Sequence, residues 1–173
     1  MHPTDSTKTP QVYADTDDNV EPSIADIVSE FRDSVQRETT LDTTQYEGVD
    51  TVRLVIHMAR VPAGSFLLPG RYLQDVGLDS FRAWNMSSTI RFFVNGREKA
   101  ERRLQKADFD ACQMDRNIRK YGVLMFPEAD SLSKKGFSIN YSLTIPMTDV
   151  GTSLNVKGRD GRILCVCDKD TGD

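Results

Sequence analysis

Cysteine and histidine, the residue types that most often carry metal or nucleophilic chemistry, are scarce in this sequence. The cysteines are Cys112, Cys165 and Cys167, without a C-x-x-C spacing, and the histidines are His2 and His57. A structural zinc site is normally closed by Cys and His ligands, so it would need nearly all of these residues, including one at the extreme N-terminus. We therefore expect reduced, partly buried thiols and no metal centre.

Motifs typical of catalysis are also missing from the sequence. It contains no phosphate-binding loop, glycine-rich dinucleotide motif, HExxH helix or nucleophile elbow. A nucleophile needs a base within hydrogen-bond reach, and the residue types allow only Cys112 with His57. His57 lies inside a strand pattern, where a packed imidazole is the more ordinary role. We expect a protein that is not an enzyme and uses no cofactor.

Basic side chains are concentrated between residues 91 and 120, which hold nine Lys and Arg residues against five acidic ones. Such a run often forms a solvated face of ion pairs, each worth less than about 1 kcal/mol. Opposite an anionic surface the same basic run contributes more binding free energy. Each cation near acidic lipid contributes about 1 kcal/mol, and contacts to phosphates of nucleic acid add similarly. The sequence leaves both interpretations open.

The net charge of −4 is concentrated at the N-terminus. Residues 1–22 contain five acidic residues and one lysine, so the rest of the chain is close to neutral. This argues against a uniformly basic nucleic-acid-binding protein. No apolar run approaches the roughly 20 residues of a membrane-spanning helix, and the first residues lack the pattern of a secretory signal. We expect a cytosolic product.

The first 50 residues fall into three segments that differ in composition and in their spacing of apolar residues. Residues 1–22 have too few large apolar groups to offset the entropy of ordering, which predicts a disordered acidic tail. One stretch in it, "PQVY", is suited to docking on a partner or a neighbouring copy. Residues 23–38 carry an apolar stripe at helical spacing behind a plausible N-cap, Ser23, which predicts an amphipathic helix. Residues 39–50 are polar and are expected to be a linker to a globular core over 51–170.

Strand patterns dominate that core. Residues 51–61 alternate and predict a strand; "SFLLPG" follows as an apolar loop, either tucked under the sheet or exposed as a contact patch. Residues 72–84 have helical spacing, and the next strand ends in Asn95-Gly96, a tight-turn signature. Residues 97–106 follow that turn like a returning strand but have the composition of a helix, and this remains open.

Three further stretches predict strands: "YGVLMFP", "KKGFSINYSLTIP" and a final pair around residues 157–161. In the second stretch apolar and polar residues alternate without interruption, which predicts that one face is buried: Phe137, Ile139, Tyr141, Leu143 and Ile145. Most connections are too short for parallel crossovers. We therefore expect a single α+β domain, with a twisted, mostly antiparallel sheet and two or three helices packed on one side.

The stretches "TVRLVIHMARVPAGSFLLPGRYLQDVGLDSFRAW" and "KKGFSINYSLTIP" resemble the matrix proteins of rhabdoviruses, above all the short cytorhabdovirus-like proteins of plant-infecting members. The first is similar to a strand that turns into a short helix ending near a Trp. The second is similar to a lysine-glycine step into a long alternating strand. The resemblance covers about residues 50–146. The acidic tail departs from animal-virus members, which carry a basic N-terminus and a P-P-x-Y motif.

The resemblance implies a virion structural protein that lies beneath the envelope and in the host cytoplasm. It would self-associate into an oligomer or helical lattice, condense the nucleoprotein–RNA complex and bridge it to the anionic inner leaflet, with the envelope glycoprotein tail as a further partner. The implied self-association candidates are Pro10, Val12, Tyr13, Phe66, Leu67 and Leu68. The implied membrane or nucleocapsid contacts are Arg97, Lys99, Arg102, Arg103, Lys106, Arg116, Arg119 and Lys120.

A β-rich binding module is the alternative function. It would bind a peptide by strand addition, a small ligand in a pocket, or single-stranded nucleic acid. In the last case Phe92, Phe93 and the adjacent Arg91 would form a stacking platform. Because Phe92 and Phe93 are neighbours in a strand, they point to opposite faces, and only one of them can stack beside a given groove.

Overall fold

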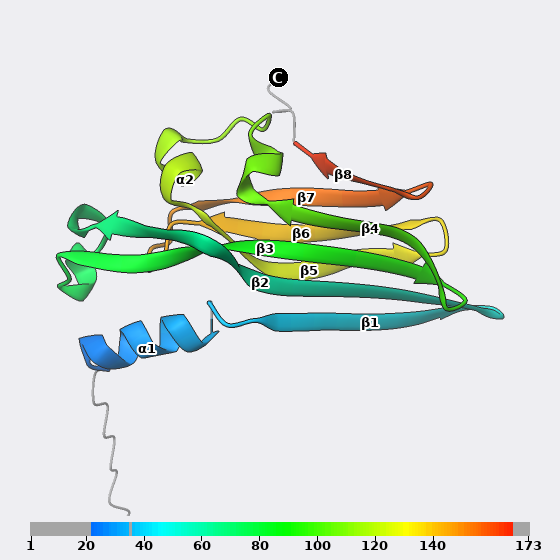
Figure 1. Cartoon of the computed structure of the whole chain (residues 1–173), viewed down its shortest axis with the longest axis horizontal. Helices are drawn as coiled ribbons and strands as arrows, with labels where there is room; N and C mark the ends of the chain where they lie inside the picture. The colour runs from blue at the N-terminus through cyan, green and yellow to red at the C-terminus, as the bar shows by residue number, and fades with distance from the viewer. Residues whose placement is uncertain (1–21, 35, 168–173) are drawn as a thin grey trace, which may run out of the picture.

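Alternating apolar residues build eight β-strands, which form two four-stranded antiparallel sheets (Figure 1). The computed structural model describes residues 22–34 and 36–167. The first sheet has the order β1 (Thr39–Glu47), β2 (Asp50–Pro69), β3 (Ser80–Val94) and β4 (Arg97–Gln105). The second has the order β5 (Val123–Ser133), β6 (Gly136–Thr144), β7 (Gly151–Arg159) and β8 (Arg162–Val166).

Short helices occupy the connections and the N-terminal side. They are α1 (Ile24–Ser34), the 3-10 turns η1 (Gly70–Tyr72), η2 (Gln74–Val76) and η3 (Lys106–Phe109), and α2 (Arg116–Tyr121). A capping box starts α1: the Ser23 hydroxyl accepts from the Asp26 N–H at 3.2 Å, and the Asp26 carboxylate accepts from the Ser23 N–H at 3.0 Å. The Ser23 hydroxyl also donates to the Asp26 carboxylate at 2.6 Å, and this bond, followed by the one from the Ser23 N–H, lowers the pKa of Asp26. Phe31 then packs edge-on against Phe81, with ring centroids 5.5 Å apart.

The core lies between the two sheets, whose inner faces pack against each other. Phe92 of β3 meets Phe137 of β6 with ring centroids 5.2 Å apart. Between the same strands, the hydroxyls of Ser88 and Tyr141 form a buried hydrogen bond of 2.7 Å. The inward set expected for residues 134–146 is confirmed, since these side chains are at most 4% exposed: Phe137, Ile139, Tyr141, Leu143 and Ile145.

Tight hairpins join the strands, and the four turns β1–β2, β3–β4, β5–β6 and β7–β8 lie at one end of the molecule, on the right in Figure 1. At Asn95-Gly96 both residues have positive φ, +51° and +72°, as a two-residue turn of this kind requires. The side chain of Asn95 also accepts from the Thr51 N–H at 2.8 Å and donates to Asp50 at 2.7 Å. These bonds tie the β3–β4 hairpin to the β1–β2 hairpin.

The expected α+β class is wrong, because the protein is a sandwich of two antiparallel sheets rather than one sheet with helices packed on a side. The physical reason is that each four-stranded meander has one apolar face. The second meander, not a helical layer, covers that face. The segment over 72–84 shows the difference most clearly: Gly77 at φ +66° ends η2, and β3 begins at Ser80 with Phe81 and Ala83 pointing inward. The short helix near Trp84, on which part of the resemblance relied, is therefore not formed.

Three other segments differ from expectation, and a fourth, which the sequence left open, is decided by the structure. The expected linker 39–50 contains the edge strand β1, whose threonine-rich sequence pairs with β2 over its whole length. The ambiguous segment 97–106 is mostly strand β4, because the hairpin at Asn95-Gly96 places it beside β3, where pairing outweighs helix propensity.

The apolar stretch 66–68 lies in β2 and not in a loop. The helix expected over 23–38 is the shorter α1, and the expected tail 1–22 lies outside the described residues except for residue 22.

Cys112 and Cys167 form a disulfide across 55 positions of sequence. It links the segment before α2 to the residue that follows β8. The expectation of reduced cysteines is therefore wrong for this pair, and Cys165 is the free, half-buried thiol. Burial raises the pKa of the Cys165 thiol.

Within the described residues, no helix is both long and apolar enough to cross a membrane.

Tyr141→Phe should lower the free energy of unfolding by about 1–3 kcal/mol, because the buried Ser88 hydroxyl loses its partner. Adding Ser88→Ala should recover much of that loss, since both polar groups are then gone. Urea unfolding of the two single variants and the double variant measures this coupling. Strictly additive effects would show that the hydrogen bond between the sheets contributes nothing.

Replacing Cys112 and Cys167 together by Ser should lower the free energy of unfolding by about 2–5 kcal/mol, because a long loop is then unconstrained in the unfolded chain. Cys165→Ser is the matched control and should change stability little. Urea midpoints with and without dithiothreitol give the measurement. A midpoint of the wild-type protein that is insensitive to the reductant would contradict the disulfide.

Candidate functional site

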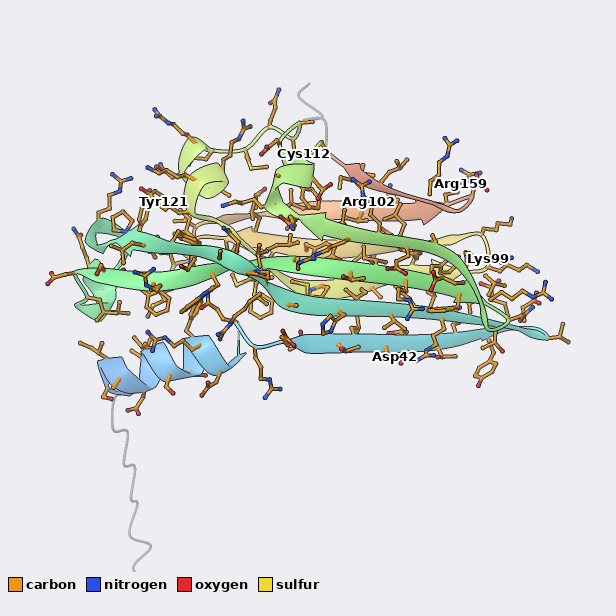
Figure 2. All side chains as sticks on the ribbon, in the orientation of Figure 1. Asp42, Lys99, Arg102, Cys112, Tyr121 and Arg159 are labelled. Atoms are coloured by element: carbon orange, nitrogen blue, oxygen red, sulfur yellow. A yellow bond between two sulfur atoms is a disulfide. The ribbon has the colours of Figure 1, made fainter. Side chains whose placement is uncertain are left out.

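The basic residues of the 91–120 run do not form one surface, because β4 carries them along the length of the sandwich. Figure 2 shows Lys99 near the hairpin end, Arg102 in the middle and Tyr121, the last residue of α2, towards the opposite end. Arg97 and Lys99 are exposed at the start of β4. The remaining predicted cations lie in the middle of β4 or in η3 and α2.

The two cations in the middle of β4 are engaged within the fold. Arg102 donates to the Ile163 carbonyl of β8 at 2.6 Å and to the Asp108 carboxylate at 2.9 Å. Arg103 donates to the Ser87 hydroxyl at 3.1 Å. Arg102 therefore ties the edges of the two sheets together, which is a structural role.

The other four predicted cations gather at the end opposite the hairpins, with aromatic residues that the sequence did not single out. There the end of β2 and η1 meet η3 and α2. We call this set the cation–aromatic cluster; its members are Phe66, Arg71, Tyr72, Lys106, Arg116, Arg119, Lys120 and Tyr121. Three rings form its floor, with Tyr121 lying 5.4 Å from Tyr72 and 6.4 Å from Phe66 between centroids.

Cations lie over these rings. The Arg71 guanidinium is 4.9 Å from the centroid of Tyr72 and 6.0 Å from that of Tyr121. Lys120 is 5.0 Å from the Tyr121 ring, and Lys106 is 5.7 Å from the Phe66 ring. Such contacts contribute about 0.5–1 kcal/mol each at exposed sites. For Arg71 and Lys120, these contacts hold the cation in place and still leave N–H groups available to an anion.

The helix α2 positions its part of the cluster through both of its ends. The Asp115 carboxylate accepts from the backbone N–H groups of Asn117 and Ile118 at 2.7 and 3.4 Å, which starts the helix. Buried Ile118 and Tyr121 anchor it to the core. At its other end, the Lys106 ammonium donates to the carbonyls of Lys120 and Gly122 at 3.1 and 3.0 Å.

Lys106 therefore caps α2 and is not free to bind a ligand. Burial lowers its pKa, partly offset by the charge of Asp110. Arg119 makes one contact, to the Cys112 carbonyl at 3.4 Å. In the described part of the chain, the exposed side chains of Arg71, Arg116 and Lys120 have no acidic partner. The cluster thus presents excess positive charge beside aromatic rings.

The predicted self-association residues have three different fates. Pro10, Val12 and Tyr13 lie outside the described residues. Phe66 belongs to the cluster, whereas Leu68 is fully buried in the core. Leu67 is 56% exposed and faces the opposite side of β2 from Phe66.

The stacking platform considered for single-stranded nucleic acid is not assembled. Phe92 is buried between the sheets. Phe93 lies on the outer face, between Arg91 and Arg53. Those arginines are paired with acids: Arg91 with Glu98 at 2.8 Å through Nε, and Arg53 with Asp42 at 2.8 Å through Nε. The outer face of this sheet is therefore largely self-neutralised.

Two residues considered for catalysis also have other partners. Cys112 is in the disulfide, and Nδ1 of His57 is 3.1 Å from the Thr40 hydroxyl on the outer face of the first sheet. Within residues 22–34 and 36–167, no group of three or more His, Cys, Asp or Glu side chains is arranged to hold a metal ion.

Sequence reasoning missed Arg71, Tyr72 and Tyr121. The signal available was weak: "GRY" follows "SFLLP", and "RKY" ends the basic run. The sequence does not show that these two segments, separated by about fifty positions, lie side by side.

Lys106→Met should lower the free energy of unfolding by about 1–3 kcal/mol, because two carbonyls at the end of α2 lose their donor. Lys120→Met, which removes an exposed cation, is the matched control and should cost at most about 1 kcal/mol, the worth of its contact with the Tyr121 ring. Urea unfolding at neutral pH measures both. Equal effects would contradict the capping role of Lys106.

The same pair of proteins gives a pH test. The folded pKa of Lys106 lies below its unfolded value, so the unfolded chain binds more protons between the two, and the contribution of this group rises with pH. The stability difference between wild type and Lys106→Met should therefore grow as pH rises towards the unfolded pKa of lysine. A difference that shrinks over this range would contradict the lowered pKa.

Comparison with known proteins adds no assignment. No protein-family model matches the chain, and no curated protein matches it significantly.

Proposed function

We propose that this chain is a non-enzymatic, matrix-type structural protein of an enveloped virion. Its cation–aromatic cluster contacts the anionic inner surface of the membrane, and many copies act together. One observation carries the proposal: separate segments of the chain bring exposed Arg71 and Lys120 over the rings of Tyr72 and Tyr121, with exposed Arg116 about one helical turn from Lys120 on α2. Cations suit acidic headgroups, and tyrosine suits an interface that is apolar on one side and wet on the other.

The energetics require many copies. Each exposed cation near acidic lipid contributes about 1 kcal/mol, so Arg71, Arg116, Arg119 and Lys120 together supply about 4 kcal/mol. That corresponds to a dissociation constant of about 1 mM for one copy. Binding of this strength becomes stable only when copies are linked and act by avidity. The weak single site thus supports a protein that works as an assembly.

Exposed apolar side chains offer contacts for such an assembly. Phe126 is 61% exposed and has a φ of +47°, a strained conformation for a bulky residue. It borders a hollow of about 440 Å³ together with Phe31, Met125 and Met147. Exposed Leu67 is a second candidate. We propose that a second copy covers one or both of these side chains.

The proposal keeps a nucleoprotein–RNA complex and the envelope glycoprotein tail as further partners, and a location in the host cytoplasm and beneath the virion envelope. Support for these comes from the resemblance alone. The lysine-glycine step into β6 retains its place in that resemblance, because Gly136 does begin the long alternating strand.

The double variant Arg71→Ala/Lys120→Ala should bind vesicles containing acidic lipid about 30-fold more weakly, because two contributions of about 1 kcal/mol are removed. Co-sedimentation of the full chain with phosphatidylserine-containing and neutral vesicles, at about 50 mM and about 500 mM salt, measures this. The variant Arg102→Glu is unsuitable, because it would also break the contacts of Arg102 with Ile163 and Asp108.

Lys135→Ala/Arg159→Ala is the matched control, since it removes two exposed cations from the opposite end. It should leave vesicle binding unchanged. Equal losses in both double variants, or equal binding to neutral vesicles, would contradict the cluster as the membrane contact. A sedimenting species that stays monomeric at every concentration and salt would contradict assembly.

A further inference from the structure

Cations also concentrate at the hairpin end, from segments far apart in the sequence. Lys99 comes from β4, Lys134 and Lys135 form the β5–β6 turn, and Arg159 precedes the β7–β8 turn. Figure 2 shows Lys99 and Arg159 at this end although they belong to different sheets. Only the stacking of the two sheets brings them together.

Two adjoining hollows lie among these residues. The first, about 510 Å³, opens between the ends of the sheets and has Phe92 and Val94 in its wall and Lys99 and Lys134 at its rim. The second, about 430 Å³, lies on the outer face of the second sheet. Lys135 and Arg159 line both hollows, so the two adjoin at these residues.

Small residues, three serines and two glycines, make up much of the lining of the second hollow, beside Phe137 and the cations. Ser131, Ser133 and Ser138 supply hydroxyl groups there. Gly136 has a φ of +152°, and a Cβ at this position would lie 2.0 Å from the Gly158 carbonyl oxygen, so only glycine fits. The site therefore combines room, hydroxyl donors and cations.

The charge lining these hollows is not balanced. Five of the six charged residues in their walls are cations, namely Lys99, Lys134, Lys135, Lys157 and Arg159, and the sixth is Asp160. Lys134 pairs with Asp50 at 3.2 Å, and Arg159 lies 3.5 Å from Asp160. In the described residues, the ammonium groups of Lys99, Lys135 and Lys157 have no hydrogen-bond or ion-pair partner. An anion with several charges would relieve this excess.

The surroundings favour a compact anion over a long one. Beyond Ser138, the outer face of the second sheet continues with neutral Asn140, Ser142 and Asn155. On the other side, Glu47 and Asp50 of the β1–β2 hairpin approach Lys134. A polyanionic strand leaving the hollows in either of these two directions would therefore find no further run of cations; beside Arg159, exposed Arg162 of β8 extends the charge by one residue. Volumes of this size suit a small ligand.

We propose that the hollows at the hairpin end form a binding site for a compact organic polyphosphate, that is, a small organic molecule bearing several phosphate groups. Lys99, Lys135, Lys157 and Arg159 contact the phosphate oxygens, and the hydroxyl of Ser131 donates a further hydrogen bond, whereas the Ser133 hydroxyl already donates to the Gly136 carbonyl at 3.3 Å. This site lies at the opposite end of the sandwich from the cation–aromatic cluster and does not depend on the membrane contact proposed there.

Isothermal titration calorimetry of the full chain with inositol hexakisphosphate tests the site, with sodium triphosphate as a smaller probe of the same chemistry. Lys135→Ala/Arg159→Ala removes the two cations shared by both hollows and should weaken binding at least tenfold. Both side chains are exposed, so the fold is retained, and a thermal melt checks this. Lys135→Arg keeps the charge and should retain most of the affinity.

Arg71→Ala/Lys120→Ala is the matched control and should bind inositol hexakisphosphate like the wild type. No binding by the wild type, or equal weakening in both double variants, would overturn the proposal. A single-stranded RNA of about 20 nucleotides is the competing probe. If it binds more tightly than inositol hexakisphosphate and also depends on Lys135 and Arg159, the site takes a strand and the compact ligand is wrong.

Discussion

The packing of two apolar sheet faces against each other is the constraint on which the rest of this structure depends. Each four-stranded meander has one face of buried side chains that it cannot cover alone. Stacking covers both faces at once, and burial of this apolar area is the main stabilising term. The contact of Phe92 with Phe137 and the hydrogen bond between Ser88 and Tyr141 set how the sheets face each other. A buried polar pair of this kind is costly to break, so it favours one arrangement.

Stacking also decides where charge accumulates. Hairpins of both sheets lie together at one end, and the β2–β3 connection meets the β4–β5 connection at the other. Cations that are distant in sequence therefore become neighbours at both ends. Between the ends, the outer face of the first sheet pairs its arginines with acids, as with Arg53 and Asp42, and the guanidinium lowers the pKa of that carboxyl. The molecule thus has two cationic ends separated by a largely neutralised face.

Local sequence signals predicted some elements well and others badly, for identifiable reasons. The alternation in residues 134–146 and the turn at Asn95-Gly96 are local properties of a strand and a hairpin, and both are present. Residues 72–84 were misjudged because a few apolar side chains at mixed spacing fit a helix as well as two short turns followed by a strand. Gly77 and pairing with β2 decided between them. Residues 39–47 were misjudged because an edge strand with one solvated face needs few apolar residues.

The sequence by itself determined the alternating strand within residues 134–146, the tight turn at Asn95-Gly96, and the concentration of cations between residues 91 and 120. It could not determine how those cations are used. Arg102 joins two strand edges and Lys106 caps a helix, whereas Lys120 stays free of acidic partners, and the three are close in the chain. Tertiary structure decided this, because the partner of a long charged side chain is set by what lies within a few ångströms in space. For these residues that neighbour comes from another strand, helix or sheet.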